Sequence, residues 1–81
     1  MATGKLARGV AAASICVRVG ARIRELRTAK GWTQQILADH AQIERAHVAR
    51  LEEGKREAGL MMLEKIAQAL ELTVSELLRG V

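Results

Sequence analysis

The chain has 81 residues and a formal net charge of +4, which permits one domain and excludes a large multidomain protein. It contains one Trp, no Phe or Tyr and no Pro, so we expect a core of Leu, Ile, Val and Ala side chains, which favours helices over sheets. The single cysteine excludes an internal disulfide bond and suits a reducing compartment.

Residues 1–13 are small and weakly patterned, and they carry two cations, Lys5 and Arg8. We expect a flexible basic arm here. The apolar run that follows is too short for a secretory signal, and no stretch approaches the length of a membrane span. A cytoplasmic protein without membrane contact is therefore expected.

The first predicted helix begins after Ser14, whose hydroxyl can cap it, and ends before Gly31, a residue typical of helix stops. Apolar residues recur along it at spacings of four, four and three, which places them on one stripe. Arg18, Arg22 and Lys30 can then reach solvent or phosphate. Trp32 is expected to pack in the core, with a stacking role for its indole as the alternative. The stripe consists of Ile15, Val19, Ile23 and Leu26.

Two short helices joined by a tight turn are predicted next. Thr33 can cap the first of them, which should stop near Ala41. Gln42 occupies the turn, and Glu44 opens a second helix over residues 44–53, where a negative charge suits the exposed amide donors. This arrangement is typical of the helix-turn-helix unit, whose second helix enters the major groove of DNA.

The remainder of the chain predicts two further helices. Gly54 is expected to end the hairpin in a left-handed conformation. Apolar residues at helical spacing over 60–70 predict the next helix. Thr73 and Glu76 form the pattern of a capping box for a short last helix over 74–79.

Charge is distributed unevenly along the chain. Residues 1–50 hold nine Lys or Arg against three Asp or Glu, whereas residues 51–81 hold four against six. A basic face beside a less basic remainder is the footprint of a polyanion binder. The alternative is a basic surface that is merely solvated. Lys5 and Arg8 have a second interpretation here, as groove or phosphate contacts.

A family resemblance rests on residues of the predicted hairpin and the loop after it. These residues are Leu37, Ala38, Ile43, Val48, Leu51, Glu52, Gly54 and Lys55. Together with the flanking segments GARIRELRTAKGWTQ and LEKIAQALELTVSELL, they resemble the helix-turn-helix family of phage repressors and Cro-like regulators, which includes the controller proteins of restriction-modification systems. The resemblance implies an all-α, compact five-helix bundle of the lambda-repressor-like type, with a DNA-binding domain over 14–81 and its hairpin over 33–53.

A helix that enters the major groove needs long hydrogen-bonding side chains beside short ones. The second hairpin helix offers Arg45, Ala46, Ala49 and Arg50, at positions that match those from which family members read bases. Either arginine can bind guanine bidentately, and either alanine can touch a thymine methyl group. The alternative is a solvated helix face that happens to carry two arginines.

The resemblance also places Gln34 at the DNA backbone, where its amide and the N–H groups of the helix terminus would contact phosphate. The other expected phosphate-binding residues are His47, Lys55 and Arg56. Gln34 has an alternative role, in which it braces a neighbour on the second hairpin helix. We rank the DNA contact ahead of bracing.

Glu52 follows Leu51 on the inward side of the second hairpin helix, where a lone carboxylate would be costly. The family places an arginine of the first helix against this glutamate, and the matching residue here is Arg27. The resemblance therefore implies a structural ion pair between Arg27 and Glu52.

The chain departs from the family pattern at several positions. Gln42 stands where glycine is common, and a left-handed turn there would cost roughly 1 kcal/mol or more. Ile36 and the two methionines at 61 and 62 stand where polar residues are usual. We predict that the methionines belong to an apolar patch suited to a two-fold contact between two copies of the chain. The alternative is that they fill an irregular core. The expected dimer interface consists of Met61, Met62, Leu77, Leu78 and Val81.

The sequence thus predicts a homodimeric regulator that binds double-stranded DNA sequence-specifically at a palindromic operator, with recognition helices about 34–36 Å apart. It would repress by occlusion or activate by touching RNA polymerase. His40 and His47 have no ligand partners at metal-binding spacing, and no nucleophile, base and orienter stand in a plausible arrangement. No enzyme, metal, cofactor or small-molecule ligand is therefore expected.

Two other classes of protein stay open. One is an antitoxin that binds both its operator and a partner toxin through its exposed methionines. The other is a protein-interaction module whose hairpin does not touch DNA.

Overall fold

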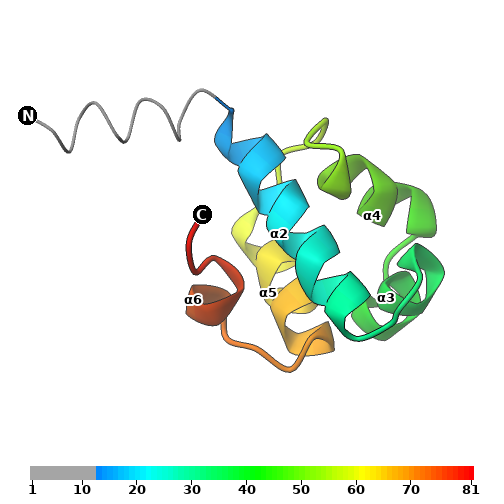
Figure 1. Ribbon diagram of the computed structural model, residues 1–81. Helices are drawn as coiled ribbons and strands as arrows, with labels where there is room; N and C mark the ends of the chain where they lie inside the picture. The colour runs from blue at the N-terminus through cyan, green and yellow to red at the C-terminus, as the bar shows by residue number, and fades with distance from the viewer. Residues whose placement is uncertain (1–12) are drawn as a thin grey trace, which may run out of the picture.

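The computed structural model describes residues 13–81, and within this range the chain forms five α-helices and no strand (Figure 1). The all-α, five-helix prediction is confirmed. The predicted basic arm, with Lys5 and Arg8, lies almost wholly in residues 1–12 and so outside the described residues. None of the described helices has the length and apolar character that crossing a membrane requires.

Helix α2 spans Ile15–Ala29, as its caps predicted. The Ser14 hydroxyl accepts a hydrogen bond from the Val17 amide at 3.3 Å, and Gly31 follows the helix with a φ of 72°. Ile23 is fully buried, but Ile15 is 59% exposed, so the predicted stripe is wrong at its first residue. The reason is that the first turn of α2 extends past the buried core.

Helices α3 (Gln34–Ala41) and α4 (Arg45–Glu52) form the hairpin. The Thr33 hydroxyl caps α3 by accepting from the Ile36 amide at 3.1 Å. Gln42 adopts the left-handed conformation, with φ 59° and ψ 45°. Glu44 is the residue before α4 and makes no side-chain capping bond, so α4 is one residue shorter at each end than predicted.

Helices α5 (Leu60–Ala69) and α6 (Val74–Leu77) complete the fold. Gly54 turns the chain out of the hairpin with a φ of 73°. The predicted capping box is present: the Glu76 carboxylate accepts a hydrogen bond from the Thr73 amide at 2.9 Å, and the Thr73 hydroxyl accepts one from the Glu76 amide at 3.0 Å. Helix α6 is shorter than the predicted range 74–79, since the chain leaves the helix at Leu78.

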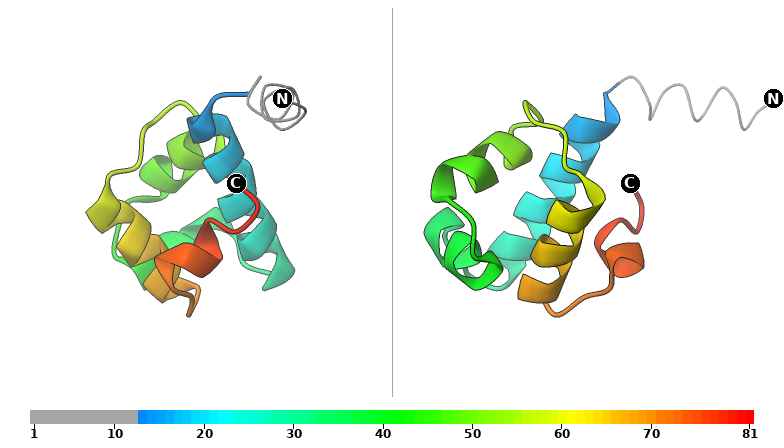
Figure 2. Two further views of the ribbon diagram at one scale, coloured as in Figure 1. Left: turned by 90° about the vertical axis from the view of Figure 1, so that its left-hand side faces the viewer. Right: turned by 180° about the vertical axis from the view of Figure 1, so that it is seen from behind.

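The core lies where the five described helices meet. In Figures 1 and 2, the α3–α4 hairpin stands on one side of α2 and α6 stands on the other, with α5 packed behind α2. Every helix contributes aliphatic side chains, and no aromatic ring is fully buried among residues 13–81. The largest fully buried side chains are Ile23, Leu37, Val48, Ile66 and Leu77.

The residues of the predicted dimer patch differ in their exposure. Leu77 is wholly buried, so its assignment to an interface is wrong; it points inward because α6 closes the core. Met62 and Leu78 are half-buried against the core, and Val81 is half-buried as well. Met61 is 79% exposed and is the one member of the predicted set that the fold leaves largely free.

Two arginines expected to reach solvent or phosphate are bound to the C-terminal segment instead. The Arg22 guanidinium donates to the carbonyl oxygens of Leu77 and Glu76, each at 3.0 Å. Arg18 donates to the carbonyl oxygen of Val81. These side chains therefore fasten the last residues of the chain to α2.

Candidate nucleic-acid interface

Helix α4 is anchored on one side and exposed on the other. Val48 and Leu51 bury their side chains in the core, with exposed fractions of 0% and 2%. The opposite side carries the recognition face, which we define as Arg45, Ala46, Ala49 and Arg50; Ala49 is half-buried and the other three residues are exposed. Because the anchored side fixes the helix, the recognition face is held outward on a rigid element.

The two arginines of the recognition face differ in their surroundings. Arg45 approaches Gln34, with its Nη1 atom 3.5 Å from the amide oxygen, at the outer limit of a hydrogen bond. The Arg50 side chain is exposed, and its guanidinium makes no hydrogen bond or ion pair with another of the residues 13–81. Between them, the small alanines leave room for another molecule to come close to the α4 backbone.

The buried ion pair implied by the family resemblance is present. Arg27 donates through Nε to Glu52 Oε2 at 2.6 Å and through Nη2 to Oε1 at 2.9 Å, a bidentate geometry. The Arg27 and Glu52 side chains are 10% and 1% exposed. A third bond, from Nη1 to the carbonyl oxygen of Trp32 at 2.7 Å, ties the pair to the segment before α3.

The contact with Glu52 favours the charged form of Arg27. Hydrogen bonding to Glu52 raises the pKa of Arg27 above its ordinary value, although burial acts against it. Among residues 13–81, no buried side-chain nitrogen or oxygen lacks a hydrogen-bond partner. The two charges are therefore fully satisfied where they lie, which is the condition for keeping an ion pair inside a fold.

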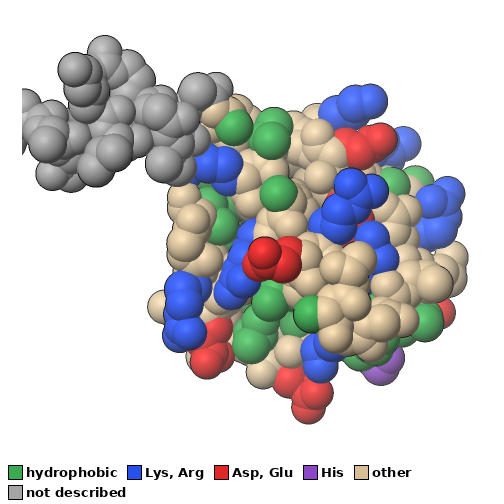
Figure 3. Space-filling view, in the orientation of Figure 1, with side chains coloured by type: hydrophobic (Ala, Val, Ile, Leu, Met, Phe, Trp, Pro, Cys, Tyr) green, Lys and Arg blue, Asp and Glu red, His purple; other side chains and the backbone are tan. Residues whose placement is uncertain are grey.

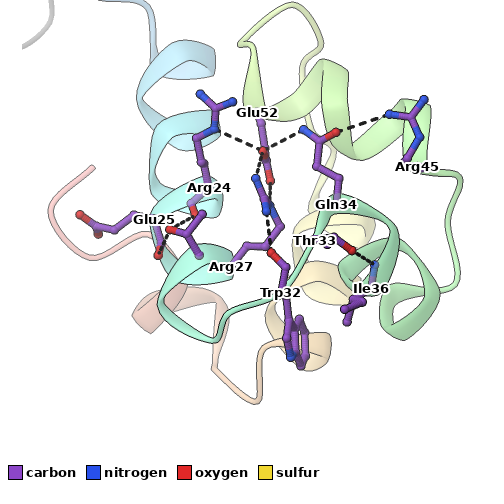
Figure 4. A network of polar contacts seen from close by, with 10 residues as sticks. Arg24, Glu25, Arg27, Trp32, Thr33, Gln34, Ile36, Arg45 and Glu52 are labelled. Carbon is purple, nitrogen blue, oxygen red and sulfur yellow. Dashed lines mark hydrogen bonds and ion pairs between the residues drawn. The ribbon is translucent and has the colours of Figure 1, made fainter.

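Gln34 braces the interface, as the alternative interpretation of its role expected. Its Nε2 atom donates to Glu52 Oε1 at 3.1 Å while its amide oxygen faces Arg45 (Figure 4). The side chain thus connects the buried pair to the recognition face. Whether Gln34 also contacts phosphate stays a prediction; its position at the first turn of α3 is compatible with both roles.

Sequence reasoning missed Arg24. Its Nε atom lies 3.7 Å from Glu52 Oε1, and its side chain is 65% exposed. A signal was available, because Arg24 stands three residues before Arg27 and so shares a face of α2 with the arginine that was expected to meet Glu52. The structure adds it to the polar network around the hairpin (Figure 4).

Of the other predicted phosphate-binding residues, His47 lies in the first turn of α4, and Lys55 and Arg56 follow the end of that helix. His47 is half-buried, whereas Lys55 and Arg56 are exposed in the loop after Gly54. In the view of Figure 3, Lys and Arg side chains gather over the side of the molecule that carries α4. This is the charge distribution that a polyanion needs.

Trp32 is half-buried and lies outside the interface. Its ring stacks on that of His40, with centroids 4.4 Å apart and planes 4° from parallel, and Lys30 Nζ lies 5.1 Å from the ring centroid. The indole packs partly against the core, as its predicted packing role requires. Within residues 13–81, no three His, Cys, Asp or Glu side chains are grouped as metal ligands.

Comparisons with known proteins agree with this geometry. A family model described as helix-turn-helix matches residues 23–77. The Competence pilus inhibition repressor of Acinetobacter baylyi is 36% identical over 59 residues, which are 73% of this chain and 54% of that protein. This chain thus spans about half the length of that relative. Control protein C.MunI of a Mycoplasma species is 36% identical over 64 residues, 78% of this chain and 86% of that protein.

A solved structure is also similar. The restriction-modification controller protein C.AhdI from Aeromonas hydrophila has a TM-score of 0.77 and 40% sequence identity, covering 80% of this chain and 98% of that one. The family match, the relatives and the hairpin with its exposed arginines lead to one assignment. The chain belongs to the helix-turn-helix family of DNA-binding transcriptional regulators, with phage-repressor-like and restriction-modification controller proteins among its members.

Proposed function

We propose that this protein binds a specific operator in double-stranded DNA by placing α4 in the major groove, and that it does so as a homodimer. The observation that carries the proposal is the recognition face, where Arg45 and Arg50 are exposed on a helix whose other side is fixed in the core. Each guanidinium has the geometry to pair with guanine O6 and N7. Ala46 and Ala49 suit contact with a thymine methyl group.

Phosphate contacts would set the position of α4 in the groove. We assign these to Gln34, at the start of α3, to His47, in the first turn of α4, and to Lys55 and Arg56, in the loop after α4. Lys55 and Arg56 are exposed in the loop after α4, and Gln34 begins α3. Such contacts hold register and orientation and carry no sequence preference themselves.

Dimerisation is proposed through the head of α5. Leu60 and Met61 are adjacent there and are 82% and 79% exposed, an unusual state for two large apolar side chains in a small domain. A two-fold contact would cover both. Two α4 helices would then face successive major grooves about 34–36 Å apart on a palindromic site. The repressor among the relatives supports repression by occupying an operator.

Selection of bound sequences from random duplexes tests this function. We expect the selected sites to contain guanine-bearing half-sites related by two-fold symmetry, and the protein to bind a full site far more tightly than one half-site. Sedimentation of the free protein and of Leu60→Glu gives the oligomeric state. Failure to enrich any sequence would contradict the proposal. A salt-independent affinity would favour a protein-interaction module, because neutralising Z phosphates gives a slope of about −0.9Z in log K against log salt.

An antitoxin-type function is the second candidate, and the exposed Leu60 and Met61 favour it. In that case the same apolar surface would bind a partner toxin in place of a second copy. Purification from the native source with a second small protein bound in a fixed ratio would support this function. A pure homodimer would contradict it.

A further inference from the structure

The carboxylate of Glu52 is shared by side chains from two other helices. Arg27 and Arg24 approach it from α2, and Gln34 approaches it from α3. We propose that Arg24 is a DNA-phosphate-binding residue, held at the edge of the interface by Glu52 next to Gln34. This inference rests on the proposed function, and it adds α2 to the DNA-binding surface.

The positive charge of Arg24 is not needed to neutralise Glu52, because Arg27 already does so. Arg27 already meets both oxygens of Glu52 at 2.6 and 2.9 Å, so the carboxylate is neutralised within the protein. Arg24 stands farther away, at 3.7 Å, with 65% of its side chain exposed. An ion pair this exposed contributes little to folding stability. The guanidinium is therefore positioned by Glu52 but free to form hydrogen bonds outward.

The place of Arg24 suits a phosphate. Gln34 bonds Glu52 with one end of its amide and faces Arg45 with the other, so Arg24, Gln34 and Arg45 form a polar strip from α2 across the start of α3 to α4 (Figure 4). A groove that receives Arg45 is bordered by a phosphodiester strand. That DNA strand would run beside Arg45, on the side where Gln34 and Arg24 lie. Protein side chains at the border of a groove contact the DNA backbone rather than the bases.

The other arginines of α2 are committed elsewhere. Arg18 and Arg22 donate to carbonyl oxygens of the C-terminal segment, and Arg27 is buried against Glu52. Arg24 alone among the four arginines of α2 keeps most of its side chain in solvent on the hairpin side. Its exposure is thus specific to this position and is not a general property of the helix.

Fluorescence anisotropy of the full chain with labelled duplexes tests the inference. Wild type, Arg24→Ala, Arg24→Lys and Arg79→Ala are titrated onto a selected operator and a scrambled duplex of equal length, from 50 to 200 mM salt. Arg79→Ala removes the same charge as Arg24→Ala. Arg79 is exposed just after α6, and α6 lies on the opposite side of α2 from α4 (Figure 1). Thermal melts verify that each variant is folded.

We expect Arg24→Ala to weaken binding roughly 3- to 10-fold at 50 mM salt, equally on both duplexes, with a salt slope smaller by about 0.9. Arg24→Lys should keep the wild-type slope, and Arg79→Ala should bind as wild type does. If Arg24→Ala matches Arg79→Ala while wild type binds DNA, this inference is overturned and the proposed function survives.

Two further outcomes would also overturn the phosphate role. A loss confined to the operator, with an unchanged slope, would make Arg24 a positioning residue for Arg45. A lowered melting temperature in both Arg24 variants would make it structural. If wild type binds neither duplex, the proposed function fails together with this inference.

Discussion

Gly20 of α2 packs directly against the backbone of Leu51 in α4, so closely that no side chain fits between the two helices. A Cβ atom at Gly20 would also stand 2.8 Å from the carbonyl oxygen of Glu52 and 2.9 Å from its carbonyl carbon. These neighbours are backbone atoms and cannot rotate away. The close approach of α2 and α4 is what brings Arg27 within reach of Glu52.

Gly20→Ala should therefore destabilise the fold by about 1–3 kcal/mol or more, because α2 must move away from α4. The sign of the change in stability shows whether the clash occurs, since replacing Gly by Ala inside a helix otherwise stabilises the fold by about 0.5–1 kcal/mol. Urea unfolding measures the change. Gly59→Ala serves as the comparison without a clash, because a Cβ there meets nothing within 4 Å and the variant should lose only the smaller preference of the α5 N-cap for glycine over alanine. Equal stability of the two variants would show that the helices are not in tight contact.

Breaking the buried ion pair should lower stability more than any surface charge change. Arg27→Ala or Glu52→Ala strands the other charge and is expected to cost about 3–5 kcal/mol. Glu25→Ala, which removes an ion pair with Arg22 whose glutamate is 70% exposed, should cost less than about 1 kcal/mol. Chemical denaturation gives the three values. DNA binding should fall only through unfolding, so a variant as stable as wild type that no longer binds would contradict a structural role.

Arg45→Ala and Arg50→Ala should reduce sequence discrimination without unfolding the protein. Each lost bidentate contact is expected to cost about 1–3 kcal/mol against the preferred base, while stability changes by about 0.5 kcal/mol or less at these exposed positions. Competition binding with single-base variants of the selected operator locates the affected base pair for each arginine. An unchanged base preference in both variants would refute base reading by α4.

Gln42→Gly should stabilise the protein. Gln42 has a φ of 59°, in the left-handed region that costs an L-residue about 1–2 kcal/mol, whereas glycine pays about 0.5–1 kcal/mol in backbone entropy. A net gain of roughly 0.5–1 kcal/mol follows, measured as a higher midpoint in urea. Gln68→Gly, within α5, is the opposite control and should lose about 1 kcal/mol. A loss at both positions would mean that the Gln42 turn is unstrained.

The capping box at α6 predicts a pH dependence of stability. Hydrogen bonding to Thr73 lowers the pKa of Glu76 below its ordinary value of about 4.5. The backbone amide of Thr73 has the larger effect, and its side chain adds to it. The Glu76 carboxylate of the unfolded chain therefore takes up a proton at a higher pH than that of the folded chain. The stability that the ionised Glu76 contributes is complete above its ordinary pKa, and it is lost as the pH falls through the lower pKa of the folded state. Glu76→Gln keeps the capping pattern but cannot titrate. Its stability curve between pH 6 and 3 should be flatter than that of wild type.

The sequence by itself determined the local structure. Ser14, Thr33 and Thr73 cap their helices as predicted, and Gln42 and Gly54 adopt left-handed conformations where the turns require them. Each of these features depends on atoms no more than a few residues apart, so the residue types carry the information. The hairpin and the family were also predictable, because the spacing of apolar residues in a short helix is a local feature of the sequence.

Only the tertiary structure decided how distant side chains were used. Leu77 is buried instead of exposed, and Arg22 binds its carbonyl oxygen from 55 residues away. Arg24 reaches Glu52, which Gln34 also contacts, because the contact at Gly20 sets the distance between α2 and α4. Such contacts depend on the angle and separation at which whole helices pack, and helical periodicity fixes neither.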